Sequence, residues 1–377
     1  MKELRKELLS NVRRMVVKLG SRLLVDSENG GVNVRTISRM MGSIAKLREK
    51  GVEVVVVTSG AVGSGMAQLG LKTKPEAMSD RQACAAVGQA QLMLAYENAA
   101  KRHGLRVGQI LCSADDFRER VRYKNIKATV DSLLRMGAIP VINENDTVAF
   151  AEIKVGDNDK LSADVSQFLG AQLLAIFTDE EGLFDKNPKE HPDAQLLKLV
   201  PEVDASIEKL AAGKGSAIST GGMATKLAAA KQATLAGCAV VLACGFRELP
   251  HRIAEGKEAG TLFLPATSRK LKSRERWLGL VSTPKGRVFV DAGAETALRQ
   301  KGRSLLPVGI VRVEGRFAAG DIVAICSADR RPVARGVASW SHDALRRVLG
   351  LKTPEVRAVL GPGRPDEFVH RNNMVLL

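Results

Sequence analysis

The chain has 377 residues, of which 45% are hydrophobic and 26% are charged, and its formal net charge is +16. This length exceeds what one hydrophobic core usually organises, so we expect two or three domains. The hydrophobic content argues against a disordered protein. No apolar run approaches membrane-spanning length, and the charged N-terminus lacks the apolar core of a signal peptide. We therefore expect a cytoplasmic protein that is not associated with a membrane.

The cysteine and histidine residues argue against several kinds of site. The five cysteines are odd in number and none has the paired spacing of a metal site. Buried free thiols in a reducing compartment are the expected state. The five histidines are scattered along the chain, so no histidine-based metal site or catalytic triad is predicted.

The first two-thirds of the chain alternates strand and helix patterns. A short helical extension is predicted at the N-terminus, and helical periodicity predicts helices over residues 34–47 and from Ser79 to about Gly104, the second beginning in a capping box. Short apolar runs predict strands at residues 15–19, 52–57, 107–111, 138–142, 173–177 and near 239–243. Continuous apolar strands between amphipathic helices are typical of a mostly parallel sheet that helices cover on both faces, a three-layer αβα sandwich.

The pattern changes near residue 265. A charged stretch at residues 268–276 predicts a linker or an exposed helix, and short glycine-punctuated strands follow at residues 286–290, 309–313 and 320–323. These predict a small β-rich domain resembling a barrel. The domains are therefore expected at residues 1–268 and 282–377. Residues 271–377 hold 19 Lys and Arg against 10 Asp and Glu, a net +9, so the C-terminal quarter is the more basic part.

Two acidic, amide-rich clusters lie close together in the first domain. Residues 143–146 (Asn-Glu-Asn-Asp) follow a predicted strand, and residues 156–160 (Gly-Asp-Asn-Asp-Lys) come ten residues later. In an α/β sheet, such groups at strand ends line the ligand-binding crevice. Together they supply acceptors and donors that suit a small zwitterion. The alternative for one cluster alone is a solvated surface loop.

Four further segments carry polar groups or glycines next to predicted strands and helices. They are residues 18–21 (Lys-Leu-Gly-Ser), 58–65 (Thr-Ser-Gly-Ala-Val-Gly-Ser-Gly), 178–179 (Thr-Asp) and the glycine loops of 213–226, which end at Lys226. A lysine beside a glycine turn or at a helix N-terminus can bind phosphate, although the Walker A spacing is absent. The many small residues of 58–65 after a buried strand favour an anion or carboxylate site. The alternatives are a surface lysine, a structural turn and an Asx turn.

Two lysines on separate glycine loops, together with strand-end carboxylates, indicate phosphoryl transfer. That chemistry depends on neutralising the charge of the transferred group more than on covalent help. A carboxylate acceptor, with a reference pKa of roughly 4.3, is already ionised at neutral pH, so no general base is required.

The six segments together resemble glutamate 5-kinase, a family of the amino acid kinase superfamily. The residues that carry the resemblance are Val17-Lys18-Leu19-Gly20, Thr58-Ser59-Gly60-Ala61, Asn143-Glu144-Asn145-Asp146, Gly156-Asp157-Asn158-Asp159, Thr178-Asp179 and Thr220-Gly221-Gly222-Met223-Ala224-Thr225-Lys226. The C-terminal part resembles a PUA domain, on residues 290–294, 304–310 and 341–345. The basic residues 1–11 and the strong positive charge depart from the family pattern, but neither departure alters a residue of these motifs.

The resemblance implies phosphorylation of the side-chain carboxylate of L-glutamate by ATP, the first step of proline biosynthesis. It implies that Ser59, Asp146 and Asn158 hold glutamate. ATP would be held by Lys18, Thr178, Asp179, Thr220, Gly221, Gly222, Met223, Ala224, Thr225 and Lys226. Lys18 and Lys226 would stabilise the transferring phosphoryl group, and Asp159 would orient both lysines. Mg²⁺ would bridge the nucleotide phosphates, with no protein side chain assigned to it.

The family also implies a homo-oligomer, a dimer or a tetramer, with proline as feedback inhibitor. Handover of the product to glutamyl phosphate reductase is a further expectation. Two alternatives remain open from the sequence. One is an amino acid kinase with a different acceptor. The other is an RNA-binding protein that acts through the basic C-terminal domain, although aromatic residues for base stacking are sparse there.

Overall fold

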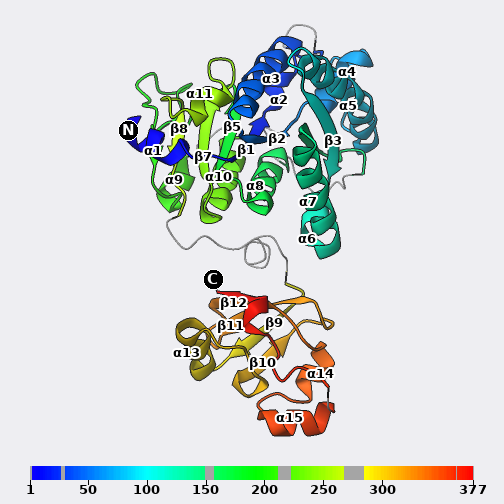
Figure 1. The fold of residues 1–377 in the computed structure, drawn as a ribbon, viewed down its shortest axis with the longest axis vertical. Coiled ribbons are helices and arrows are strands. Elements are labelled where there is room, and N and C mark those ends of the chain that lie inside the picture. The colour runs from blue at the N-terminus through cyan, green and yellow to red at the C-terminus, as the bar shows by residue number, and fades with distance from the viewer. Residues whose placement is uncertain are drawn as a thin grey trace. The chain divides into compact units, whose positions relative to one another are not determined.

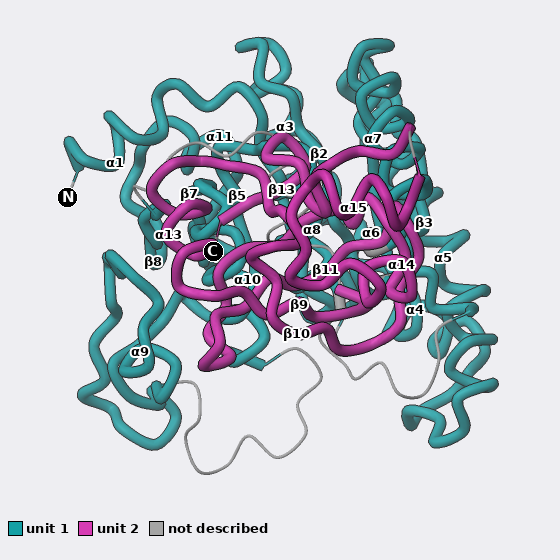
Figure 2. The backbone as a smooth tube through the Cα atoms, turned by 90° about the horizontal axis from the view of Figure 1, so that it is seen from below, with its two compact units in different colours: residues 1–270 teal, residues 271–377 magenta. Residues whose placement is uncertain are grey.

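The computed structural model describes residues 2–26, 30–148, 157–210, 222–266, 284–361 and 363–376. The chain divides into two compact units, residues 1–270 and 271–377 (Figure 2). The predicted linker at residues 268–276 lies outside the described residues, and the predicted domain limits of 268 and 282 stay predictions.

The first unit is built on an eight-stranded sheet with the order β3-β4-β2-β1-β5-β7-β8-β6. Its strands are β1 (Arg14–Leu19), β2 (Glu53–Val57), β3 (Arg106–Cys112), β4 (Ala138–Glu144), β5 (Leu173–Thr178), β6 (Leu199–Val200), β7 (Ala239–Cys244) and β8 (Thr261–Phe263). Neighbouring strands run parallel except β7 and β8, which are antiparallel. The predicted mostly parallel sheet and all six predicted strands are confirmed.

Helices cover both faces of this sheet (Figure 1). The helices of the unit are α1 (Lys2–Leu9), α2 (Ser21–Leu24), α3 (Val34–Glu49), α4 (Ala61–Gln68), α5 (Met78–Lys101), α6 (Ala114–Arg118), α7 (Arg120–Arg135), α8 (Asp157–Leu169), α9 (Ala205–Leu210), α10 (Met223–Leu235) and α11 (Pro250–Ala254). The core on one face joins the strands to α3 and α5, while α7, α8 and α10 pack against the other face. The three layers match the predicted sandwich.

Helix α3 shows why the sequence pattern predicts these elements well. Apolar residues with helical spacing form its buried stripe: Ile37, Met40, Met41, Ile44 and Leu47. Asn33 caps the helix, since its side-chain oxygen accepts a hydrogen bond from the backbone N–H of Thr36 at 3.0 Å. The start of α5 differs from expectation. It begins at Met78, so Ser79 lies inside the first turn, and the predicted capping box is wrong.

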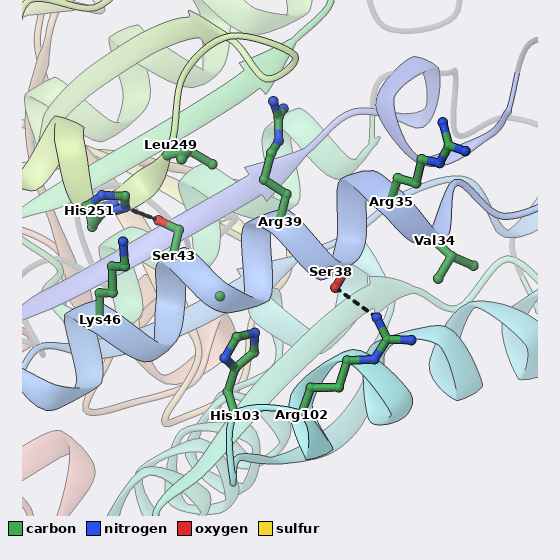
Figure 3. Close-up of a pocket in the computed structure, with 11 residues that line it drawn as sticks. Val34, Arg35, Ser38, Arg39, Ser43, Lys46, Arg102, His103, Leu249 and His251 are labelled. Atoms are coloured by element: carbon green, nitrogen blue, oxygen red, sulfur yellow. Dashed lines mark hydrogen bonds between the residues drawn. The ribbon is translucent and has the colours of Figure 1, made fainter.

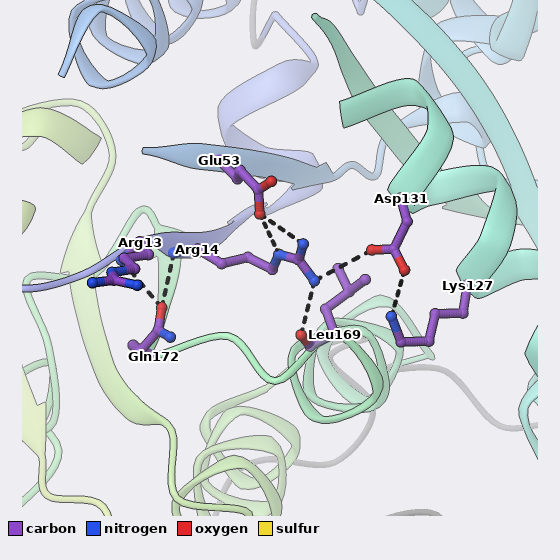
Figure 4. Close-up of polar contacts among 7 residues, drawn as sticks. All are labelled: Arg13, Arg14, Glu53, Lys127, Asp131, Leu169 and Gln172. Atoms are coloured by element: carbon purple, nitrogen blue, oxygen red, sulfur yellow. Dashed lines mark hydrogen bonds and ion pairs between the residues drawn. The ribbon is translucent and has the colours of Figure 1, made fainter. Parts of the chain in front are cut away.

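Arg14 ties the sheet to two helices at the edge where β1 and β2 begin (Figure 4). Its guanidinium donates to the carboxylate of Glu53 on β2 and to the carbonyl of Leu169, at 3.0 Å, at the end of α8. It also pairs with Asp131 of α7 at 3.3 Å. This partly buried network fixes the edge opposite to the strand ends that carry the motifs.

The second unit is a five-stranded sheet with the order β10-β9-β11-β12-β13. Its strands are β9 (Gly286–Val290), β10 (Ile310–Glu314), β11 (Ile322–Ser327), β12 (Pro332–Val337) and β13 (Met374–Leu376), and its helices are α13 (Ala292–Lys301), α14 (His342–Arg346) and α15 (Thr353–Leu360). All neighbours are antiparallel except β9 and β11. The three predicted strands are confirmed, and Trp340 and Phe368 lie in a separate hydrophobic core.

The cysteines are all buried and carry free thiols, as predicted. Burial, with a smaller contribution from nearby carboxylates, raises the pKa of Cys112 to about 12, so this thiol is unreactive at neutral pH. No helix in the described parts of the chain combines the length and the apolar character that crossing a bilayer requires.

Candidate active site

The motif segments meet because the ends of four parallel strands are in register. Lys18 of β1 lies opposite Val57 of β2 and Ile176 of β5, and Val57 lies opposite Ile142 of β4. The residues at or just beyond these strand ends therefore share one edge of the sheet: Lys18, Thr58, Ser59, Asn143, Glu144, Thr178 and Asp179. The sequence predicts each segment separately, and the register brings them together.

Asp159 is the centre of the site. It lies in the first turn of α8 and is 1% exposed. One carboxylate oxygen pairs with the ammonium of Lys18, and the other pairs with Lys226 at 3.3 Å. Thr225 donates a hydrogen bond to the same carboxylate at 2.7 Å. The structure thus brings together residues from β1, α8 and α10, and both lysines are themselves almost fully buried.

The carboxyl group of Asp159 is ionised despite its burial. Burial is the largest influence on its pKa and would raise it, but the charges of Lys18 and Lys226, with hydrogen bonds from Lys18 and Thr225, lower it overall. The pKa of Lys226 is also lowered, mainly because burial disfavours the ammonium form, against the opposing charge of Asp159. Two cations around one anion leave an excess of positive charge, which suits the oxygens of a transferring phosphoryl group.

Asn158 connects the two amide-rich clusters. Its side-chain oxygen accepts a hydrogen bond from the backbone N–H of Glu144 at 3.3 Å, which joins the end of β4 to the start of α8. Its side-chain N–H₂ makes no hydrogen bond to another described residue, so it is a donor suited to a carboxylate. Asp146 is half-buried and lies two residues beyond β4, on the same edge.

The glycine-rich segment after β2 is partly a packing device. Ser59 is buried at the strand end, and Gly60 has a φ of +97°, which explains a glycine there. Gly65 lies against α5, because a Cβ built on it would stand 1.7 Å from the carbonyl oxygen of Cys84. Small residues here are expected to form an anion or carboxylate site, but the need for glycine at position 65 comes from packing. Gly65 lets α4 lie close to α5.

Two residues of the site are absent from the sequence prediction. Arg22 of α2 pairs with Asp179 at 2.7 Å, while Thr178 donates to the other oxygen of that carboxylate at 3.0 Å. Burial would raise the pKa of Asp179, but hydrogen bonds from Arg22 and Thr178 lower it overall. Gln89 of α5 accepts a hydrogen bond from the buried amide of Asn143 at 2.8 Å. For Arg22, its position directly after Gly20-Ser21 is a sequence signal that could have identified it as a site residue. Gln89 has no such signal.

The start of α10 carries the last motif. Gly222, Met223, Ala224, Thr225 and Lys226 are described, with Gly222 in an extended conformation before the helix begins at Met223. Thr220 and Gly221, which are also predicted to hold ATP, lie outside the described residues, as does residue 156 of the second cluster. In the described parts of the chain, no three His, Cys, Asp or Glu side chains are grouped to hold a metal ion.

Comparisons with known proteins identify the family of this chain. The model of the amino acid kinase family matches residues 13–244, and that of the PUA domain matches residues 286–360. Glutamate 5-kinase from Pelobacter propionicus is 45% identical over 99% of this chain and 100% of its own length. Glutamate 5-kinase from Geobacter sulfurreducens is also 45% identical, over 99% of this chain and 100% of its own length. Glutamate 5-kinase from Trichlorobacter lovleyi is 47% identical over 99% of this chain and 99% of its own length. By these matches the chain belongs to the amino acid kinase family, within its glutamate 5-kinase branch.

Proposed function

We propose that the protein transfers the γ-phosphoryl group of ATP to the side-chain carboxylate of L-glutamate. The products are L-glutamyl 5-phosphate and ADP, and the reaction is the first step of proline biosynthesis. Besides the similarity to glutamate 5-kinases, one structural observation supports this proposal. The buried carboxylate of Asp159 pairs with Lys18 and Lys226 at the edge of the sheet where the strands end. Such an arrangement fixes two positive charges where a phosphoryl group would pass between its donor and acceptor.

The transfer needs little covalent help from the protein. An oxygen of the glutamate side-chain carboxylate bonds to the γ-phosphorus as the bond from that phosphorus to the bridging oxygen of ADP breaks. The carboxylate is already ionised, so no proton has to be removed. Lys18 and Lys226 would donate hydrogen bonds to the phosphate oxygens as negative charge shifts toward ADP, and Asp159 would keep both ammonium groups in position.

Each substrate has its own group of residues in the proposal. Ser59, Asp146 and Asn158 would hold the amino-acid end of glutamate, the last through its side-chain amide. Thr178, Asp179 and the segment from Thr220 to Lys226 would hold ATP. Mg²⁺ would enter with the nucleotide, because it is usually held by substrate phosphates and water with few protein ligands. That fits the engagement of Asp159 by two lysines and of Asp179 by Arg22.

Several wider expectations belong to the same proposal. We infer a cytoplasmic homo-oligomer, a dimer or a tetramer, that proline inhibits by feedback, with handover of the labile acyl phosphate to glutamyl phosphate reductase. RNA binding by the basic second unit remains the alternative function and is tested separately by salt-titrated binding.

A hydroxamate assay tests the activity directly. The purified protein with ATP, Mg²⁺, hydroxylamine and glutamate should form glutamyl hydroxamate, whereas aspartate, acetylglutamate and carbamate should give little product. An equal rate with another acceptor would reassign the substrate. The absence of any glutamate-dependent ADP release would overturn the proposed reaction.

Replacing Lys226 by alanine is expected to lower kcat by about 100-fold or more, the loss typical of one missing electrostatic contact in a transition state. The reason is that Lys226 is one of the two cations that Asp159 holds at the site. The measurement is kcat at saturating glutamate and ATP. Lys231→Ala is the matched control, since Lys231 lies on the same helix but pairs with Glu208 on the surface and should leave kcat unchanged. Near-normal turnover by Lys226→Ala would contradict the assigned role.

Replacing Asn158 by alanine should mainly raise KM for glutamate, by about tenfold or more, because a hydrogen bond to a charged group is lost. The effect on kcat should be small, since an interaction made equally in the bound substrate and the transition state does not change turnover. Asn125→Ala on the exposed face of α7 serves as the control. A fall in kcat with unchanged KM would place Asn158 with the phosphoryl group instead.

A further inference from the structure

A groove whose described ionisable side chains are all basic lies on the outer face of α3 (Figure 3). Its floor is one face of that helix, with helical spacing between Arg35, Ser38, Arg39, Gly42, Ser43 and Lys46. Leu249 and His251, at the start of α11, form one wall, and Arg102 and His103, just after the end of α5, form the other. Its volume is about 640 Å³, within the range of small-molecule sites.

The charge of the groove is unbalanced. Arg35, Arg39, Lys46 and Arg102 carry permanent positive charges, and no Asp or Glu is among its described lining residues. The pKa of His251 is lowered, first by its burial and then by the nearby charge of Lys46, which indicates a positive potential. Glu255, the acidic residue that acts on His251, is itself paired with Lys50.

Two of these cations remain available to a ligand. Neither Arg35 nor Lys46 makes a hydrogen bond or an ion pair with another described residue, and both are exposed. Among the described residues, the side chain of Arg102 makes a single, long hydrogen bond of 3.4 Å, to Ser38. Gly42 shapes the floor, because a Cβ there would stand 3.0 Å from the imidazole of His103. Cations held in a concave site without carboxylates favour a ligand with several negative charges.

Arg39 connects the groove to the nucleotide side of the active site. Its guanidinium donates to the backbone carbonyls of Gly245 and Phe246, which follow β7. The backbone N–H of Gly245 donates in turn to the carbonyl of Thr178 at 2.8 Å, next to Asp179. An anion that competes with these carbonyls for Arg39 would loosen the residues that pack beside Thr178.

We propose that this α3 groove binds a small polyanion, an organic molecule with two or more phosphate or carboxylate groups, and that binding weakens ATP binding through Arg39. The size of the groove favours a small molecule over nucleic acid. Its residues are separate from those proposed to bind glutamate or ATP, so the site would regulate the enzyme.

The test uses pyrophosphate and citrate as probes on the full-length protein, with binding measured by calorimetry without nucleotide. The double variant Arg35→Gln/Lys46→Gln should weaken binding of the preferred probe by about tenfold or more, as expected for the loss of charge-assisted hydrogen bonds. Lys72→Gln/Lys74→Gln removes the same charge from exposed positions elsewhere in the unit and should leave binding unchanged. Preference for one probe identifies phosphate or carboxylate as the recognised group.

Kinetics at constant free Mg²⁺ then test the link through Arg39. The preferred probe should raise KM for ATP in the unmodified protein, and Arg35→Gln/Lys46→Gln should abolish this rise. A rise that persists in the double variant would mean competition inside the active site and would overturn the proposal. The proposal would also be overturned if both double variants bound the probe equally well. Loss of probe binding in Lys226→Ala would overturn it too. Binding of RNA in the groove with no binding of either probe would replace the small anion by a nucleic acid.

Discussion

Asp159→Asn should lower kcat by about 100-fold or more and should also destabilise the first unit. The asparagine keeps the shape of the side chain and can still accept a hydrogen bond from Thr225, but it removes the negative charge that Lys18 and Lys226 share. Both lysines are almost fully buried, so their charges would then repel each other without compensation. Removing one partner of a buried ion pair typically costs about 3–5 kcal/mol of folding stability.

The pH dependence of this stability follows from the lowered pKa of Asp159. A carboxyl group with a lowered pKa in the folded state stabilises the protein above its unfolded pKa, which is roughly 3.9 for aspartate. That contribution is lost as the pH falls through the lower folded pKa. The difference in unfolding free energy between the unmodified protein and Asp159→Asn should therefore be complete at neutral pH and shrink only in acid.

Asp164→Asn is the matched control for both measurements. Asp164 is a buried carboxylate on the same helix, five residues further along, where it pairs with Lys160 at 3.3 Å and accepts a hydrogen bond from Gln232. Its replacement should cost stability but leave kcat close to that of the unmodified protein. If the two variants lost turnover equally, the effect of Asp159 would be structural and its orientation of the lysines would be wrong.

Local patterns in the sequence predict most of the fold. The stripe from Ile37 to Leu47 and the β-branched run of β2 depend on periodicity and burial, which neighbouring residues encode. The predicted start of α5 is less accurate, because Ser79 is a residue type that often caps helices but here lies one residue inside the helix. The identities of the site residues come from strand-end composition and from the resemblance, and the register of the parallel strands then explains why they meet.

Contacts between distant segments could not be read from the sequence. Arg22 and Asp179 are 157 residues apart, and Asn143 and Gln89 are 54 apart, so no local pattern links either pair. The groove on α3 needs residues from α3, α5 and α11. The same limit applies to Gly65. The composition of residues 58–65 suggests a ligand-binding loop, but glycine is needed at position 65 because the backbone of α5 lies against it.

Gly65→Ala is expected to destabilise the first unit by about 3 kcal/mol or more, at or above the upper end of ordinary overpacking. The added Cβ would stand 1.7 Å from the carbonyl oxygen of Cys84 and 2.9 Å from the backbone nitrogen of Gly88. These are backbone atoms of α5, so no side chain can move aside. The two helices would have to separate, and unfolding in urea should reveal the loss.

The same change should weaken glutamate binding, because α4 begins immediately after Ser59 and Gly60. A displaced α4 moves the backbone that positions Ser59, so KM for glutamate should rise in any Gly65→Ala protein that still folds. Gly42→Ala is the control within the same unit. There the new Cβ would meet only the exposed imidazole of His103, and alanine favours a helix by about 0.5–1 kcal/mol over glycine. Stability that matched the unmodified protein in Gly65→Ala would contradict the close backbone approach of α4 to α5. A raised KM with unchanged stability would instead place Gly65 toward the ligand.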